Sequence, residues 1–369
     1  MGRQGCQPTQ YNMGFLGVAA LLCVPLTTSG LVHTVGSWGS CTGVVCRRRW
    51  NGERRARSNI AVALSPSTPS RGTSSSDDDW DVVSALENMR FDNSALRELK
   101  ADPVHGGPVR RVRGAHLARV DPSPLKSPTL AALSPEAMAL IGLPAKTIAD
   151  IDGAQQRALA EILSGNRILP GSEPFAACYC GHQFGIFAGQ LGDGAVMSIG
   201  EVVNDQGQRW ELQLKGAGLT PFSRMADGRK VLRSSVREYL CSEAMHHLGI
   251  PTTRALALVV SDSRVTRDLT SVGQLRDEKC AVLVRVAEGF LRFGSFEVCL
   301  VSDSATAPSA GLEKQVLAPL LSYAIGRHMP SAGMARDGAT GAEFLKRVAQ
   351  KTAALVAAWQ AVGFVHGVL

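Results

Sequence analysis

The sequence predicts an α+β fold in which a small antiparallel-sheet lobe is followed by a helical lobe. Short, glycine-punctuated runs of strand-forming residues fill the middle of the chain, one amphipathic helix pattern interrupts them, and two longer helix patterns close the chain. This order predicts four segments: a disordered leader over 1–78, a helical and extended extension over 79–175, the sheet lobe over 176–300, and the start of the helical lobe over 301–369.

Strands are predicted where strand-forming runs lie between turn residues. The predicted strands are Phe184–Gln190, Ala195–Val203, Trp210–Leu214, Ala255–Val260 and Cys280–Val286. The polar stretch Ser261–Lys279 is predicted to be a loop.

Helices are predicted where apolar residues recur every three or four positions. In the sheet lobe this pattern covers Val231–Leu248 and ends at Gly249 and Pro251, which are typical helix terminators. The other predicted helices are Trp80–Met89, Pro135–Ile141, Gln155–Leu163, Glu313–Arg327 and Ala342–Val362.

The net charge of +7 belongs to the leader. Residues 1–76 hold eight arginines, no lysine and one acid, so the rest of the chain is neutral. A nucleic-acid surface needs a basic stripe on the folded domain, and we therefore expect no nucleic-acid partner.

The leader is rich in Arg, Ser and Thr and nearly free of acids, which is typical of a mitochondrial or plastid presequence. A bipartite signal-plus-transit leader and an over-extended translation start are the alternatives. The apolar run Met13–Leu26 is shorter than the ~20 residues of a membrane helix, so no stable membrane span is expected.

Cysteines and histidines give little indication of metal chemistry. Cys178 and Cys180 form a close pair, but no ligand cluster follows at metal-site spacing, and buried thiols beside a strand are the favoured interpretation. His182 is expected to be a hydrogen-bonded structural residue.

Three features in order suggest a phosphate site. The glycine-rich stretch Gly189–Gly194 lies between two predicted strands, where glycines allow close approach of backbone N–H groups to phosphate. Lys215 ends the next strand, and Glu238 lies on the following helix. A glycine-rich hairpin, a strand lysine and a helix carboxylate that orients the lysine form the protein-kinase arrangement for holding phosphates.

Arg285 and Arg292 follow on the last strand and just after it. Arginine binds phosphate in bidentate fashion, and aromatic neighbours indicate that Arg292 is partly buried. A pair of structural salt bridges is an equal alternative.

The chain resembles the selenoprotein O family over a region from about Phe91 to Leu369. The resemblance rests on long strings, among them GHQFGIFAGQLGDG, ELQLKGAGLTPFSRMADGRKVLRSS and RFGSFE. It implies a protein-kinase-like fold and transfer of AMP from ATP to Ser, Thr or Tyr hydroxyls of protein substrates. It also implies that Mg²⁺ takes part and that ATP is flipped relative to kinases.

Carried over to this sequence, the resemblance makes Lys215 the phosphate lysine and Glu238 its ion-pair partner. It assigns the nucleotide contacts to Gly192, Gly194, Asp227, Gly228, Arg285 and Arg292. The family usually has an arginine directly after Gly-Asp-Gly, where this chain has Ala195, and weakened ATP binding is therefore expected.

The resemblance places the catalytic Asp and the Mg²⁺-binding residues beyond Leu369, so no catalytic or metal-binding residue is expected in this chain. We expect the chain as given to bind nucleotide weakly without transferring AMP. Two other functions stay open: a protein kinase, which would transfer the γ-phosphate, and a catalytically dead nucleotide-binding or scaffold fragment.

Overall fold

The computed structural model describes residues 81–183, 185–268, 273–300, 313–329 and 338–366. The predicted leader lies outside these residues. The described residues all belong to one compact unit.

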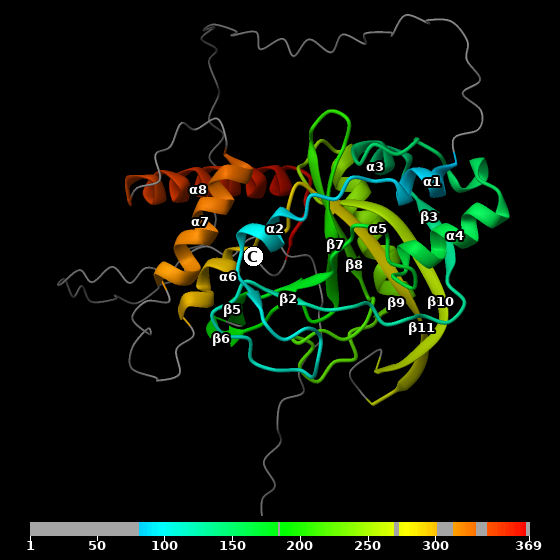
Figure 1. Cartoon of the computed structure of the whole chain (residues 1–369), viewed down its shortest axis with the longest axis horizontal. Coiled ribbons are helices and arrows are strands. Elements are labelled where there is room, and N and C mark those ends of the chain that lie inside the picture. Colours follow the sequence, from blue (N-terminus) through cyan, green and yellow to red (C-terminus); the bar gives the residue numbers. More distant parts are fainter. Residues whose placement is uncertain (1–80, 184, 269–272, 301–312, 330–337, 367–369) are drawn as a thin grey trace, which may run out of the picture. The chain divides into compact units, whose positions relative to one another are not determined.

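A mostly antiparallel nine-stranded sheet forms the centre of the fold (Figure 1). Its order is β1-β2-β4-β7-β8-β11-β10-β3, with β9 pairing with β11, and only β1 and β2 run parallel. The strands are β1 (Ala101–Asp102), β2 (Leu117–Arg119), β3 (Thr129–Leu133), β4 (Phe175–Ala177), β7 (Val196–Val203), β8 (Arg209–Lys215), β9 (Lys230–Val231), β10 (Arg254–Asp268) and β11 (Leu275–Ala287). A separate two-stranded sheet contains β5 (Cys180–Gln183) and β6 (Ile186–Gln190).

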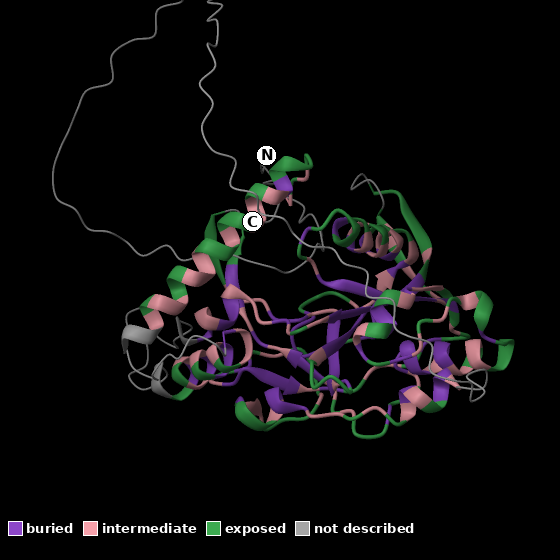
Figure 2. Ribbon diagram, turned by 90° about the horizontal axis from the view of Figure 1, so that it is seen from above, coloured by how far each residue is buried: buried purple, intermediate pink, exposed green. Residues whose placement is uncertain are grey.

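The sheet is larger than the sequence predicted. Strands β1, β2 and β3 come from the predicted extension, and the predicted boundary after residue 175 falls inside β4, which pairs with β2 on one edge and β7 on the other. One hydrophobic core runs from Val82 to Val316 and includes residues from both sides of that boundary. Figure 2 shows the buried residues concentrated along the strands at the centre of the fold. The extension is thus part of the same core, because its short strands complete the sheet.

The predicted loop Ser261–Lys279 is wrong over most of its length. Strands β10 and β11 continue as an antiparallel ribbon, with pairs from Arg264 opposite Lys279 to Asp268 opposite Leu275. This part of β10 alternates between exposed and intermediate burial, so neither side needs an apolar row. Polar composition there reflects a solvated ribbon, whose backbone hydrogen bonds form whatever the side chains are.

All the predicted helices are confirmed, with shifted ends. They are α1 (Val82–Glu87), α3 (Pro135–Leu140), α4 (Gly153–Leu163), α5 (Leu232–His247), α7 (Ala318–His328) and α8 (Gly338–Ala361), and the structure adds α2 (Ser94–Glu98) and α6 (Phe293–Phe296). Asp81, Ser134 and Asp152 cap α1, α3 and α4 by accepting N–H groups of the first turn. Among the described helices, none is both long and apolar enough to cross a bilayer.

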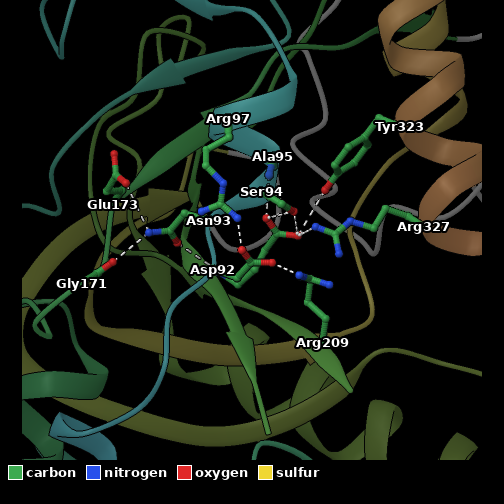
Figure 3. Close-up of polar contacts among 11 residues, drawn as sticks. Asp92, Asn93, Ser94, Ala95, Arg97, Gly171, Glu173, Arg209, Tyr323 and Arg327 are labelled. Carbon is green, nitrogen blue, oxygen red and sulfur yellow. Dashed lines mark hydrogen bonds and ion pairs between the residues drawn. The ribbon is translucent and has the colours of Figure 1, made fainter. Parts of the chain in front are cut away.

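A buried carboxylate fastens α2 and α7 to the sheet. Glu201 on β7 accepts hydrogen bonds from Ser94 and the Ala95 N–H of α2, and from Tyr323 and Arg327 of α7. Figure 3 shows these partners converging, with Asp92 held between Arg97 and Arg209 beside them. Glu201 therefore links the sheet to the first long helix of the predicted helical lobe.

Candidate active site

The predicted lysine–carboxylate pair is present. The Lys215 Nζ lies 2.6 Å from Glu238 Oε2, and the two side chains are only 8% and 6% exposed. Lys215 is the last residue of β8, and Glu238 lies in the second turn of α5, which packs against β10 and β11. Strand register and helix packing thus bring together two residues that are 23 positions apart in the sequence.

Arg285 is the second cation on the same carboxylate. Its Nη1 lies 3.4 Å from Glu238 Oε1, and its Nη2 donates to Gln213 Oε1 at 2.6 Å. Gln213 and Arg285 are register partners on β8 and β11, which places both side chains on the face that α5 covers. The structure therefore contains the salt bridge that the sequence offered as one alternative for Arg285.

The pair lies in a positively charged environment. Burial alone would raise the pKa of the Glu238 carboxyl, but Lys215, Arg285 and Lys230 together lower it below its ordinary value. Burial lowers the pKa of Lys215 to about 8, and the neighbouring Arg285 and Lys230 act in the same direction while Glu238 opposes them. Glu238 thus contacts two cations and lies near a third, Lys230, which leaves positive charge uncompensated.

The glycine-rich segment differs from the predicted hairpin. β6 and β7, on either side of it, belong to different sheets. Gly192 has φ +67°, and a Cβ there would lie 2.2 Å from the Phe222 ring; a Cβ on Gly194 would lie 2.8 Å from the Phe222 carbonyl oxygen. Close packing against Phe222 explains both glycines.

The backbone N–H groups of this segment are already in use. The N–H groups of Leu191 and Gly192 donate to Tyr179 O, that of Asp193 donates to Ala177 O, and that of Gly194 donates to Gly192 O. These N–H groups could therefore bind a nucleotide phosphate only if the present hydrogen bonds changed. Otherwise the phosphate near Gly192 and Gly194 would have to be bound by side-chain cations nearby.

Arg292 is held at the glycine-rich segment itself. Its Nη2 lies 2.9 Å from Asp193 Oδ1, and its guanidinium stacks over the Tyr179 ring, 4.6 Å from the centroid. Only 11% of its side chain is exposed, which confirms the partial burial that the aromatic neighbours predicted. The ion pair with Asp193 thus holds the Arg292 guanidinium next to the glycine-rich segment.

Asp227 and Gly228 lie in the loop between β8 and β9. Asp227 forms a bidentate ion pair with Arg267 of β10, with both N–O distances 2.7 Å, and accepts the Arg229 N–H. Gly228 has φ +69°, and a Cβ there would lie 2.0 Å from Gly218 O. The extended β10 ribbon therefore fixes this loop.

Some predicted residues lie outside this arrangement. His182 is partly exposed, with Nδ1 3.5 Å from Glu297 Oε1, in keeping with a structural role. Cys178 and Cys180 are buried and form no disulfide, in keeping with the buried thiols that were expected.

Four charged residues near the site were not predicted: Asp193, Glu211, Lys230 and Arg267. Asp193 could have been found from its place between Gly192 and Gly194. Arg267 has no such signal, because it comes from a polar stretch about 40 residues away from Asp227.

Glu211 on β8 is a buried acid beside the site. Its Oε2 accepts the Phe290 N–H at 3.0 Å, two residues before Arg292. Burial raises the pKa of the Glu211 carboxyl to about 7, and the negative charge of Glu201 acts in the same direction. Because the folded pKa is raised above the ordinary value, the folded state binds the proton more tightly, and stability is lost as pH rises towards 7.

We expect Glu211→Gln to remove that pH dependence. The amide oxygen still accepts the Phe290 N–H, while the ionisation cost disappears. The variant should gain about 2–4 kcal/mol in free energy of unfolding over wild type at pH 8, and much less at pH 5. Urea unfolding at both pH values measures this, with the exposed Glu98→Gln as control. An equal difference at pH 5 and pH 8 would contradict the assignment.

The described residues do not provide a Mg²⁺ site here. Near the site, Glu238 is paired with Lys215 and Arg285, Asp193 with Arg292, and Asp227 with Arg267. A cluster of Glu136, Glu243 and His247 lies elsewhere, on α3 and α5, but Arg254 bridges its two carboxylates at 3.4 and 2.7 Å. A guanidinium already neutralises these oxygens, so the cluster is an ion-pair network.

The structure is an α+β domain with a lysine on a strand next to a glycine-rich segment, and a helix carboxylate holds that lysine. Nucleotide-binding lobes that hold phosphates have the same arrangement. The chain belongs to the SelO family, since the family model described as "Protein adenylyltransferase SelO" matches residues 114–369.

Curated relatives agree with this assignment. The chain is 52% identical over 298 residues to "Protein adenylyltransferase SelO, mitochondrial" of Mus musculus, covering 77% of this chain and 44% of the relative. The human protein of that name is 52% identical over 296 residues, with the same shares covered. "Protein nucleotidyltransferase YdiU" of Methylobacillus flagellatus is 50% identical over 281 residues, or 76% of this chain and 51% of the relative. The chain thus spans about half the length of the curated relatives it matches.

Proposed function

We propose that this chain is the ATP-binding portion of a protein adenylyltransferase with a protein-kinase-like fold. The observation that carries the proposal is the buried Lys215–Glu238 pair, which is shared with Arg285 and leaves surplus positive charge beside the glycine-rich segment. A triphosphate is the kind of ligand that such charge favours.

In this proposal each residue has a separate task. Lys215 donates to a phosphate oxygen, and Glu238 holds its ammonium in place. Arg292, fixed by Asp193, presents its guanidinium at the segment around Gly192 and Gly194. Asp227 and Gly228, braced by Arg267, contribute the loop on the other side. Arg285 acts through Glu238 and can reach the nucleotide only by exchanging that partner.

The proposed reaction is transfer of AMP from ATP to Ser, Thr or Tyr hydroxyls of protein substrates. The names of the relatives support adenylyl transfer over kinase activity. In the transfer, the acceptor hydroxyl gives its proton to a general base, a role that the family resemblance assigns to an Asp. Its oxygen forms a bond to the α-phosphorus, the bond to the β-phosphate oxygen breaks, and pyrophosphate leaves. Mg²⁺ would neutralise phosphate charge and position the leaving group. The residues described at this site hold the nucleotide and contribute no ligand for the ion.

Ala195 adds a specific expectation about affinity. Its position follows Gly-Asp-Gly, and a methyl group there supplies no charge to the phosphates. Binding of ATP is therefore proposed to depend more strongly on the cations that are present, Lys215 first among them.

Calorimetric titration of the chain with ATP tests the proposal. Wild type should bind ATP, and Lys215→Ala should weaken binding by at least about tenfold, because a charge-assisted hydrogen bond is lost. Lys279→Ala is the matched control, since Lys279 lies on β11 in an exposed ion pair with Asp262. Equal affinity in wild type and Lys215→Ala would overturn the proposed site.

Transfer is tested with ATP labelled at the α- or the γ-phosphate. The assay uses this chain and, in parallel, this chain joined to the remaining length of the mouse relative. Incorporation of α-label into protein by the joined chain is expected, whereas incorporation of γ-label would favour the kinase alternative. Binding without either transfer would favour the scaffold alternative.

We also propose import into mitochondria. The relatives from mouse, human and zebrafish are named mitochondrial, and residues 1–78 have the composition of a presequence. Fusion of residues 1–78 to a fluorescent reporter tests this, and a cytosolic reporter would count against it.

A further inference from the structure

We propose that Lys230 is a second phosphate-binding lysine of this site, next to Lys215. This inference rests on the proposed function, because it takes the ligand to be a polyphosphate. It assigns a role to a lysine that neither the sequence motifs nor the Lys215–Glu238 pair required.

The sheet register places the two lysines side by side. Both β8 and β9 pair with the same edge of β11: Lys215 is opposite Leu283, and Lys230 is opposite Ala281. Residues two apart on a strand point to the same face, and antiparallel partners share that face. Lys215 and Lys230 therefore lie on one face of the sheet, with backbones about 7 Å apart along β11.

This face is the one that α5 covers. Arg285, two residues after Leu283, lies on the same face and reaches Glu238 from it. α5 packs against β9 as well as against β10 and β11. Three cations thus form a row along β11, in the order Lys230, Lys215, Arg285, with Glu238 above them.

The neighbouring carboxylates are committed to other cations. Glu238 is taken up by Lys215 at 2.6 Å and Arg285 at 3.4 Å. Asp227, the other acid near Lys230, has both oxygens on Arg267. Among the described residues, no carboxylate oxygen lies within ion-pair distance of the Lys230 ammonium, and no hydrogen bond from it is seen.

Lys230 is nevertheless partly buried. Burial lowers its pKa, and the positive charges of Arg267 and Arg285 add to this effect, while Glu238 and Asp227 oppose it. A lysine that has lost part of its solvent and has no counter-ion in contact is unfavourable in the free protein. A phosphate oxygen at this position would supply the missing anion.

Gly216 makes the close approach possible. It has φ +109°, and a Cβ there would lie 2.5 Å from Ala281 O and 3.0 Å from the Lys230 Cβ. Its N–H donates to Ala195 O at 2.8 Å, so Lys230 packs beside the turn that faces the end of the glycine-rich segment. Lys230 therefore supplies positive charge close to Ala195, whose own side chain is uncharged.

Calorimetric binding of ATP and of inorganic tripolyphosphate by wild type, Lys230→Met and Lys230→Arg tests the inference. We expect Lys230→Met to weaken both ligands about tenfold and to reduce the salt dependence of the dissociation constant, while Lys230→Arg retains most of the affinity. Lys279→Ala should leave both affinities unchanged.

Unfolding without ligand separates binding from folding. Removing a partly buried cation that has no carboxylate in contact should leave the melting temperature of Lys230→Met equal to or above that of wild type. Unchanged affinity of Lys230→Met for both ligands would overturn the inference, as would a lowered melting temperature that accounts for weaker binding. If wild type binds tripolyphosphate through Lys230 but does not bind ATP, the anion site stands and the proposed function fails.

Discussion

Replacing Glu238 with glutamine should destabilise the protein by about 3–5 kcal/mol, because it leaves buried cations without their carboxylate. Arg285 is 3% exposed and stays charged, and the amide nitrogen of glutamine would face one of the two cation donors. Urea unfolding near pH 7 measures the effect. The exposed Glu98→Gln, on α2, is the control and should change stability little.

Lys215→Met, unlike Glu238→Gln, should leave the stability of the protein nearly unchanged. It removes one of three cations around Glu238 and fills the same volume, so the free energy of unfolding should stay within about 1 kcal/mol of wild type or rise. Binding of ATP should nevertheless be lost. If the Lys215–Glu238 pair served only to stabilise the fold, Lys215→Met would lower the free energy of unfolding as much as Glu238→Gln.

Gly192→Ala is the second large effect, expected to cost about 2–4 kcal/mol. Gly192 has φ +67°, which is strained for alanine, and the new methyl would overlap the Phe222 ring at 2.2 Å. Phe222 is fully buried, so neither partner has room to move.

Gly189→Ala provides a matched control within the same segment. Gly189 has φ +68°, but nothing lies within 4 Å of the position that an alanine methyl group would take there. Its substitution should cost only the backbone strain of about 1–2 kcal/mol. The difference between the two variants isolates the Phe222 contact, and equal losses would contradict that packing argument.

The sequence predicted best those features whose signals are local. Helix α5 was predicted within one residue at each end, because Gly249 and Pro251 mark its end and its apolar spacing marks its body. Lys215 and Glu238 were predicted as partners from their places on a strand and the next helix, and they lie 2.6 Å apart.

Features that depend on distant partners were missed. Strands β1, β2 and β4 have two or three residues each, too few for a periodic pattern, and exist because the sheet edge pairs with them. The β10–β11 ribbon is polar, so composition concealed its strands and hence the brace from Arg267 to Asp227. The glycine-rich segment lies between two strands as predicted, but those strands form no hairpin, and only Phe222 shows why the segment needs glycine.

A crystal structure of the chain with a non-hydrolysable ATP analogue tests directly whether Lys215 holds a phosphate group. We expect a phosphate oxygen within hydrogen-bond distance of the Lys215 Nζ, with the Lys215–Glu238 pair retained. A nucleotide bound elsewhere, with the Lys215 ammonium still contacting Glu238 alone, would contradict this expectation.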